Sequence, residues 1–316
     1  MLRWILAGVV GLAVVVVAVV AFLHFRGGDG PAAPDIAFVT EPRDLHDPDA
    51  PTKRDFIDFA ELEHSLPLSP ADRMKITPDN LKALTQEQVD QIYARLPAGP
   101  IPDGIYHGGA FFPQGEEGYS RIGEVVGGIM GRGVTAISDG IERVATYVWK
   151  GKAFDRDNMV LRNLIEDRKT LEAIIGSDAD GIEAVEIERR GILSFVMPTR
   201  TVWLLFPAKL HCGQSLLDSR RESIIIDYAY NDDLEGVFHE NPDHWVNRKG
   251  LRIRDEIRMV RPGFYLGRAY INRAFILNFT LYNEDVAAGQ EGTFLAGGDV
   301  GADCWPDAEQ ISAAAD

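Results

Sequence analysis

Asp255 is the residue of this sequence whose surroundings most strongly suggest chemistry. It lies in LRIRDEIRMV (251–260), a segment that alternates like a β-strand. The face that carries Asp255 also carries Leu251, Ile253, Ile257 and Met259. A carboxylate among aliphatic side chains is costly unless it is paired. Asp255 is therefore predicted to be either a buried structural partner or part of a polar group inside a pocket.

Two further polar residues lie in similarly apolar, strand-like segments. These are Asp227 in ESIIIDYAY and Asn278 in FILNFTLY, and we expect both to meet Asp255 inside the domain, together with Arg268. Two carboxylates could act as acid and base, as they do in glycoside hydrolysis. A buried hydrogen-bond network that fixes strand register is the favoured alternative, because strands often carry such pairs.

Cysteine and histidine chemistry is poorly supported by the spacing of these residues. His211 and Cys212 are adjacent, so in a strand they point to opposite faces and cannot form a nucleophile–base pair. A Cys212 thiol nucleophile would need another histidine as its base, and His107 is the best candidate. Cys212 and Cys304 are the two cysteines, and in an oxidising compartment they could form one disulfide. The sequence contains no motif with metal-ligand spacing and predicts no metal and no cofactor.

The composition restricts the classes of partner. The formal net charge is -16 and the sequence pI is about 4.9. Nucleic acids and anionic lipid surfaces both require clustered Lys and Arg, so the charge argues against nucleic acid as a partner.

The N-terminal segment predicts a membrane anchor. Trp4 to Leu23 contains no charged residue and, as a helix, would rise about 30 Å, enough to cross a bilayer. A cleaved signal peptide is the alternative, but no small-x-small site follows the apolar run. We predict a single-pass cytoplasmic-membrane protein. Arg3 and Arg26 orient it weakly, and the usual behaviour of signal anchors puts the remaining chain on the extracytoplasmic, periplasmic side.

Behind the anchor, the patterns predict four further regions. A Gly- and Pro-rich tether spans 27–54, a collar of short helices 55–98, an antiparallel β-rich, barrel-like domain 99–286, and a tail 287–316. An amphipathic helix is predicted as an insertion at 118–148. The predicted fold class is mainly β with helices, arranged as an antiparallel barrel or a strongly curved sheet.

Three short stretches resemble a known family. Gly104-Ile105-Tyr106 resembles the G-x-W start of lipocalin-like, calycin-type barrels, with Tyr in place of Trp, and Ile226-Asp227-Tyr228 resembles their T-D-Y element. The stretch from Arg254 to Gly267 is similar to their closing hairpins. The resemblance covers about residues 104–283. It implies a small antiparallel barrel whose interior binds an apolar small molecule or lipid.

Our leading hypothesis is a membrane-anchored domain that binds a lipid or other hydrophobic small molecule in a barrel-like interior. The expected ligand-binding residues are Tyr106, His107, Asp227, Tyr228, Asp255, Tyr265 and Asn278. One alternative is an envelope hydrolase or isomerase that acts on a lipid-like substrate through the aspartates or His107. Another is a non-catalytic subunit of a membrane complex, which docks a protein partner through the helix from Tyr119 to Val148.

Overall fold

A computed structural model describes residues 31–39, 57–113, 148–166, 168–175, 181–188, 198–237 and 242–305. Its β-strands are β1 Gly104–Phe111, β2 Trp149–Asp155, β3 Val160–Ile165, β4 Ala184–Glu188, β5 Thr199–Gln214, β6 Glu222–Asp227, β7 Ile253–Arg261, β8 Phe264–Ile271 and β9 Ala274–Tyr282. Its helices are α2 Phe59–Ser65, α3 Pro70–Lys75, η1 Asn80–Ala83, α4 Gln86–Ala94, α7 Arg168–Ile175, η5 Asn231–Asp233, η6 Asp243–Trp245 and α8 Glu284–Leu295.

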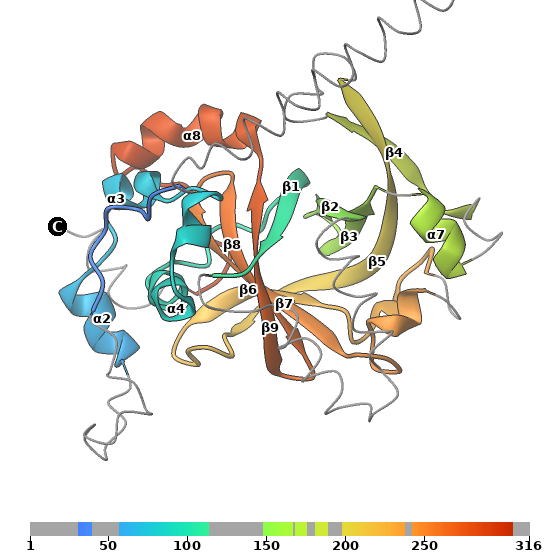
Figure 1. The fold of residues 1–316 in the computed structure, drawn as a ribbon, viewed down its shortest axis with the longest axis horizontal. Helices are drawn as coiled ribbons and strands as arrows, with labels where there is room; N and C mark the ends of the chain where they lie inside the picture. The colour runs from blue at the N-terminus through green and yellow to red at the C-terminus, as the bar shows by residue number, and fades with distance from the viewer. Residues whose placement is uncertain are drawn as a thin grey trace, which may run out of the picture.

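The strands form a closed antiparallel barrel, which confirms the predicted mainly β fold (Figure 1). Eight strands follow one another around the barrel in chain order, and every neighbouring pair is antiparallel. Two pairings complete the circle: β3 pairs with β5, and the first strand β1 pairs with the last strand β9. The remaining strand, β4, pairs with the N-terminal part of β5 and lies outside the circle.

Short helices cover one outer face of the barrel, as the sequence predicted. The start of α4 is a capping box, in which the Thr85 side chain accepts from the Gln88 N–H and the Gln88 side chain accepts from the Thr85 N–H. The buried face of α4 packs on β7 and β8 through Val89, Ile92, Tyr93, Val260 and Leu266. Part of the predicted tether also packs here, because the Gln91 side chain bonds the backbone of Val39 at 2.9 and 3.0 Å.

The C-terminal prediction requires a correction. Residues 287–316 were predicted as a tail because they are rich in Gly and Ala, yet Glu284–Leu295 forms the helix α8. The Asn283 side chain caps this helix by accepting from the Val286 N–H at 3.1 Å, and Phe294 is buried. One N-terminal cap and one buried aromatic side chain therefore outweigh the low propensity of its two glycines.

Some predictions fall outside the described residues. These are the apolar segment 4–23 and the helix predicted at 118–148, of which only Val148 is described. Two described elements, α7 and β4, were not predicted. Within the ranges described above, no helix combines the length and the apolar character needed to cross a bilayer.

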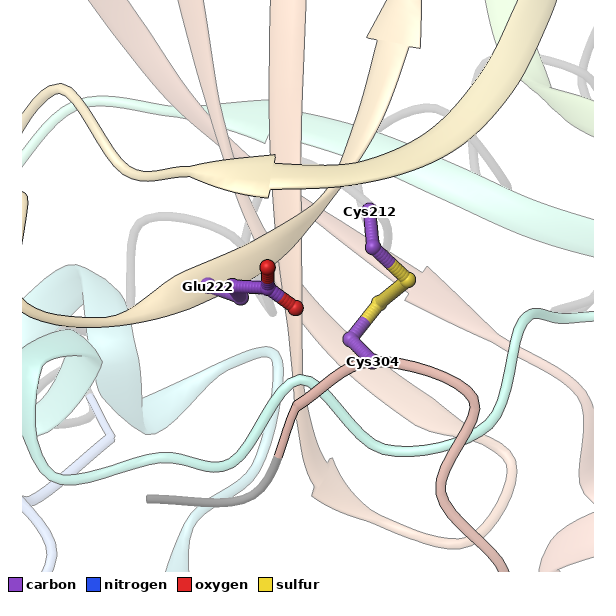
Figure 2. Close-up of side chains that lie close together, drawn as sticks. All are labelled: Cys212, Glu222 and Cys304. Atoms are coloured by element: carbon purple, nitrogen blue, oxygen red, sulfur yellow. A yellow bond between two sulfur atoms is a disulfide. The ribbon is translucent and has the colours of Figure 1, made fainter.

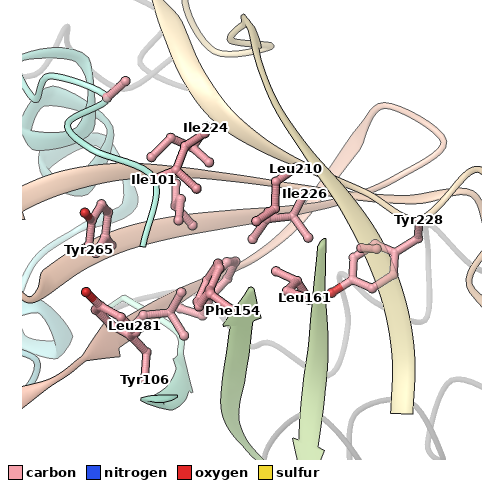
Figure 3. Packing of buried hydrophobic residues seen from close by; sticks show 14 of the residues in the cluster. Ile101, Tyr106, Phe154, Leu161, Leu210, Ile224, Ile226, Tyr228, Tyr265 and Leu281 are labelled. Atoms are coloured by element: carbon pink, nitrogen blue, oxygen red, sulfur yellow. The ribbon is translucent and has the colours of Figure 1, made fainter. Parts of the chain in front are cut away.

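One end of the barrel is filled by its own side chains (Figure 3). The ring of Tyr106 on β1 makes edge contacts with Phe154 on β2 and Tyr265 on β8, with centroids 5.5 and 5.8 Å apart. Leu281, Ile224 and Ile101 pack around them. We refer to this part of the interior as the filled end.

Two chain segments cover the filled end. Residues 97–101 cross it, with the Tyr265 hydroxyl donating to the Pro100 carbonyl at 2.6 Å. Residues 299–305 lie beside them, and a disulfide joins Cys304 to Cys212 on β5, with a Cα–Cα distance of 5.3 Å (Figure 2). These are the two cysteines considered for pairing from the sequence, so the C-terminal segment is covalently attached to the barrel.

Candidate functional site

The opposite end of the barrel is hollow. A cavity of about 660 Å³ lies inside the strands there, and its lining is mostly apolar. All eight barrel strands or their immediate extensions contribute to the lining, including Ala110, Trp149, Ile165, Leu205, Ile253, Ala269, Leu277 and Phe279. The loop between β6 and β7 forms part of the entrance and places Trp245, which is 44% exposed, beside Lys249. We refer to this part of the interior as the hollow end.

A cluster of polar side chains lies in the wall of the cavity. Lys152 on β2 is at its centre and is 2% exposed. Its Nζ donates to the Asp255 Oδ2 at 2.9 Å, to the Tyr228 hydroxyl at 2.7 Å and to the Asn163 Oδ1 at 2.9 Å. An ammonium group has three protons, so these three bonds use all of them.

Asn163 connects this cluster to the wall and to the entrance. Its Oδ1 also accepts from the Trp149 indole N–H at 3.0 Å, and its Nδ2 donates to the Tyr228 hydroxyl and to the Phe206 carbonyl, both at 3.0 Å. Phe206 has a φ of 52° at an irregularity of β5, and its N–H donates to the Asp243 Oδ1 at 2.9 Å. One bulged residue thus bonds both the buried cluster and the entrance helix η6.

The electrostatics of the cluster keep Lys152 protonated. Burial alone lowers the pKa of Lys152, but the charge of Asp255 and the bonds to Tyr228 and Asp255 outweigh it, and the net pKa is raised. Burial raises the pKa of Tyr228 to about 12, despite the opposing charge of Lys152. A nucleophilic lysine needs a lowered pKa, so Lys152 is built as a permanent cation paired with Asp255.

Aromatic rings enclose the charge from the other sides. The Lys152 Nζ lies 5.4 Å from the ring centroids of Trp149 and Phe279. Ring faces attract a cation, and this attraction is larger where water is excluded. The ion pair is therefore stabilised within a largely apolar cavity.

The structure brings two of the predicted ligand-binding residues to the cavity, Tyr228 and Asp255. Asp255 shares its inward face with Leu251 and Ile253, as the alternation predicted. Tyr106 and Tyr265 also point into the barrel, but they lie at the filled end.

The other predicted residues face away from the cavity. The register pairs Ile226 with Asp255 and Asp227 with Arg254, so Asp227 is on the outer face, where it accepts from the Ala229 N–H at 2.7 Å. Asn278 is on the outer face of β9 and donates to Gln86 of α4 at 2.8 Å. His107, one residue after the inward Tyr106, is on the outer face of β1. The side chains of Asp227 and Asn278 therefore do not lie beside Asp255, contrary to expectation.

The chemistry proposed for the cysteine also requires correction. Both cysteines of the chain are joined in the disulfide, so Cys212 offers no thiol nucleophile. Within the described residues, Cys212, Glu222 and Cys304 form a group close enough to surround a metal ion, but its two sulfur atoms are bonded to each other (Figure 2). Glu222 instead accepts from the Trp305 N–H at 2.7 Å.

Sequence reasoning missed Lys152 and Asn163. A signal for both was present, because alternation through WKGKAF puts Lys152 on the same face as the apolar Phe154, and alternation through VLRNLI puts Asn163 on the same face as Leu161. A lysine on the inner face of a barrel strand needs a carboxylate, and Asp255 was the unpaired candidate.

The fold and the cavity together define an eight-stranded, up-and-down antiparallel barrel with one filled and one hollow end. Comparison with family models, with curated proteins and with solved structures finds no match for this chain.

Proposed function

We propose that this protein binds a lipid or other hydrophobic small molecule inside the hollow end of the barrel. The observation that carries the proposal is the cavity of about 660 Å³, which is large, mostly apolar and open at the end that bears Trp245. Binding sites for small molecules have this size and this composition, an apolar wall with a few placed polar groups. The cluster around Lys152 and Asp255 supplies those groups.

The resemblance to lipocalin-like barrels supports the same function. An eight-stranded up-and-down barrel is just wide enough to hold one small ligand when its interior is not filled by side chains. Gly104-Ile105-Tyr106 opens the first strand of such a barrel, and Tyr228 of the second similar stretch lines the cavity. The hollow end, rather than the fold alone, is what supports a carrier role.

We further propose that the barrel is held at a membrane by the apolar segment 4–23 and lies on its extracytoplasmic side. The disulfide between Cys212 and Cys304 supports this location, because disulfides persist in oxidising compartments such as the periplasm. Fusions of alkaline phosphatase and of a cytoplasmic fluorescent reporter to the C-terminus test it. The phosphatase fusion is expected to be active. An inactive phosphatase fusion together with a fluorescent reporter fusion would show that the domain lies on the cytoplasmic side.

The binding proposal is tested by filling the cavity. Ala269 on β8 lines the cavity, pairs with Asp255 and has room beside it, so Ala269→Phe places a ring where the ligand would lie. Ala184→Phe, at an exposed position of β4, adds the same ring outside the barrel and serves as the matched control. Full-length protein in detergent is titrated with Nile red, a neutral apolar dye.

We expect the parent chain and Ala184→Phe to bind the dye, and Ala269→Phe to bind it at least about tenfold more weakly, a loss of about 1.4 kcal/mol. Thermal unfolding of Ala269→Phe at an undiminished temperature shows that the ring fills space rather than disrupting the fold. Equal affinity in all three proteins, or no dye binding by the parent chain, would refute the proposal.

A further inference from the structure

The polar cluster in the cavity contains one oxygen atom that no described residue uses. Lys152 and Tyr228 both bond the Oδ2 of Asp255, at 2.9 and 3.3 Å. Within the described ranges of the chain, the Oδ1 of Asp255 accepts no hydrogen bond, although the residue is only 5% exposed and lines the cavity. A carboxylate oxygen can only accept, so the group that completes this site must be a donor.

The remaining polar atoms of the cluster are already committed. All three protons of the Lys152 ammonium and both amide protons of Asn163 are bonded within the protein. The Tyr228 hydroxyl accepts from Lys152 and Asn163, and its own proton is directed to the Asp255 Oδ2 at 3.3 Å or to the Asn163 Oδ1 at 3.4 Å. The cluster therefore offers a ligand an acceptor but no spare donor.

The charge of the cluster restricts the ligand further. Lys152 and Asp255 neutralise each other in a site that apolar and aromatic side chains surround. A carboxylate or phosphate beside this pair would bury an extra negative charge with no donor to meet it, and an ammonium would bury an extra positive charge. Both are costly in surroundings of low polarity, whereas a neutral ligand leaves the balance unchanged.

From this cluster we infer that the ligand is a neutral apolar alcohol, whose hydroxyl group donates to the Oδ1 of Asp255, and that the site discriminates against the corresponding fatty acid anion. This inference rests on the proposed binding function and specifies its ligand class. It also reverses the simplest interpretation of a lysine in an apolar cavity, which is that its ammonium binds a carboxylate.

A ligand series that differs at one end tests the inference without any mutation. Full-length protein loaded with Nile red is titrated with oleyl alcohol, its methyl ether, octadecene and oleate, and displacement of the dye is followed. The alcohol is expected to bind at least about tenfold more tightly than the ether, which has the oxygen but no proton to donate. Oleate is expected to bind more weakly than the alcohol, because its carboxylate adds a negative charge beside a pair that is already neutral.

Substitution of the carboxylate should change these preferences in a defined way. In Asp255→Asn the amide oxygen remains with the Lys152 ammonium and the NH₂ group faces the cavity, where it donates to an alcohol and to an ether alike. The preference for alcohol over ether should disappear, and oleate should gain affinity because the Lys152 charge is no longer balanced. Asp227→Asn, a neighbouring carboxylate on the outer face, is the matched control and should retain the parent preferences.

The outcomes separate this inference from the proposed function. If alcohol, ether and hydrocarbon displace the dye equally, or if oleate binds most tightly, the inference is overturned and the hydrophobic cavity still stands. If the parent chain binds neither the dye nor any member of the series, the binding function is overturned, and this inference with it. Should Asp255→Asn fail to fold, the series on the parent chain still decides.

Discussion

The filled and hollow ends of the barrel are built by the same strands, and two of these strands carry different side chains at positions four residues apart. On β1, Tyr106 occupies the filled end and Ala110 the hollow end; on β8, Tyr265 occupies the filled end and Ala269 the hollow end. The spacing keeps each pair on one face of its strand. At both pairs of positions the filled end therefore carries an aromatic ring where the hollow end carries a methyl group.

The polar side chains differ between the two ends as well. At the filled end the Tyr265 hydroxyl bonds the Pro100 carbonyl of the covering segment, so the polar atom contributes to closure. At the hollow end the polar atoms bond one another around Lys152, and the surrounding space stays open. Closure by a covering segment and open space for the proposed ligand therefore lie at opposite ends of the barrel.

The largest loss of stability is expected from breaking the ion pair between Lys152 and Asp255 at the hollow end. Lys152→Met leaves Asp255 buried without its partner, which should lower the free energy of unfolding by about 3–5 kcal/mol in denaturant titrations. The double variant Lys152→Met with Asp255→Leu should recover most of the loss, because an apolar pair can replace a buried ion pair. A double variant as unstable as the single one would show that the pair itself holds the barrel together.

A similar but slightly smaller loss is expected from the filled end when its covalent link is removed. Cys212→Ser with Cys304→Ser opens a loop of 92 residues and should lower the free energy of unfolding by about 3–4 kcal/mol. Nile red affinity should not change, because the cavity lies at the other end. A parallel loss of dye binding would contradict the separation of the two ends.

A matched pair of leucines on β9 compares the packing of the two ends directly. Leu281→Ala, at the fully buried filled end, should cost about 3 kcal/mol, whereas Leu277→Ala, which already faces the cavity, should cost roughly half as much. The loss is smaller there because the removed atoms have fewer neighbours. Equal losses in chemical denaturation would mean that the hollow end is as tightly packed as the filled one.

The smallest expected loss of stability occurs only at alkaline pH. Burial raises the pKa of Tyr106 and of Tyr228 to about 12, with Asp103 adding to the rise at Tyr106. An unfolded tyrosine ionises near pH 10, so the unfolded chain releases these protons at a lower pH than the folded protein does. The contribution of the two tyrosines to the free energy of unfolding is therefore fully present below about pH 10 and is lost as the pH rises towards 12. Tyr106→Phe and Tyr228→Phe should each weaken the dependence of the free energy of unfolding on pH, as measured by urea titrations. A pH dependence that neither variant changes would exclude these residues as its source.

Patterns within single segments predicted this structure well. Alternation in LRIRDEIRMV placed Asp255 and its aliphatic neighbours on the inner face, and the collar predicted at 55–98 contains α4, which starts at a capping box of Thr85 and Gln88. In both cases the physical cause is local: the two-residue period of a strand and the capping of free N–H groups.

Relations between segments could not be predicted in the same way. Asp227 and Asp255 each lie in an apolar strand, but the register pairs Asp255 with Ile226, and a shift of one residue moves a side chain to the other face. Register depends on turns and packing that one strand does not reveal. For the same reason the partner of Asp255 was not identified, since Lys152 is 103 residues away in the chain.

The pairing of β1 with β9 limits when the barrel can close during synthesis. Contacts across that seam, such as the Thr280 hydroxyl with the Gly109 carbonyl, join residues 171 positions apart. During synthesis β1 has no partner on that side until Tyr282 has emerged, and an unpaired strand edge is a template for aggregation in the meantime. The wall of the cavity can therefore close only after nearly the whole domain has been translated.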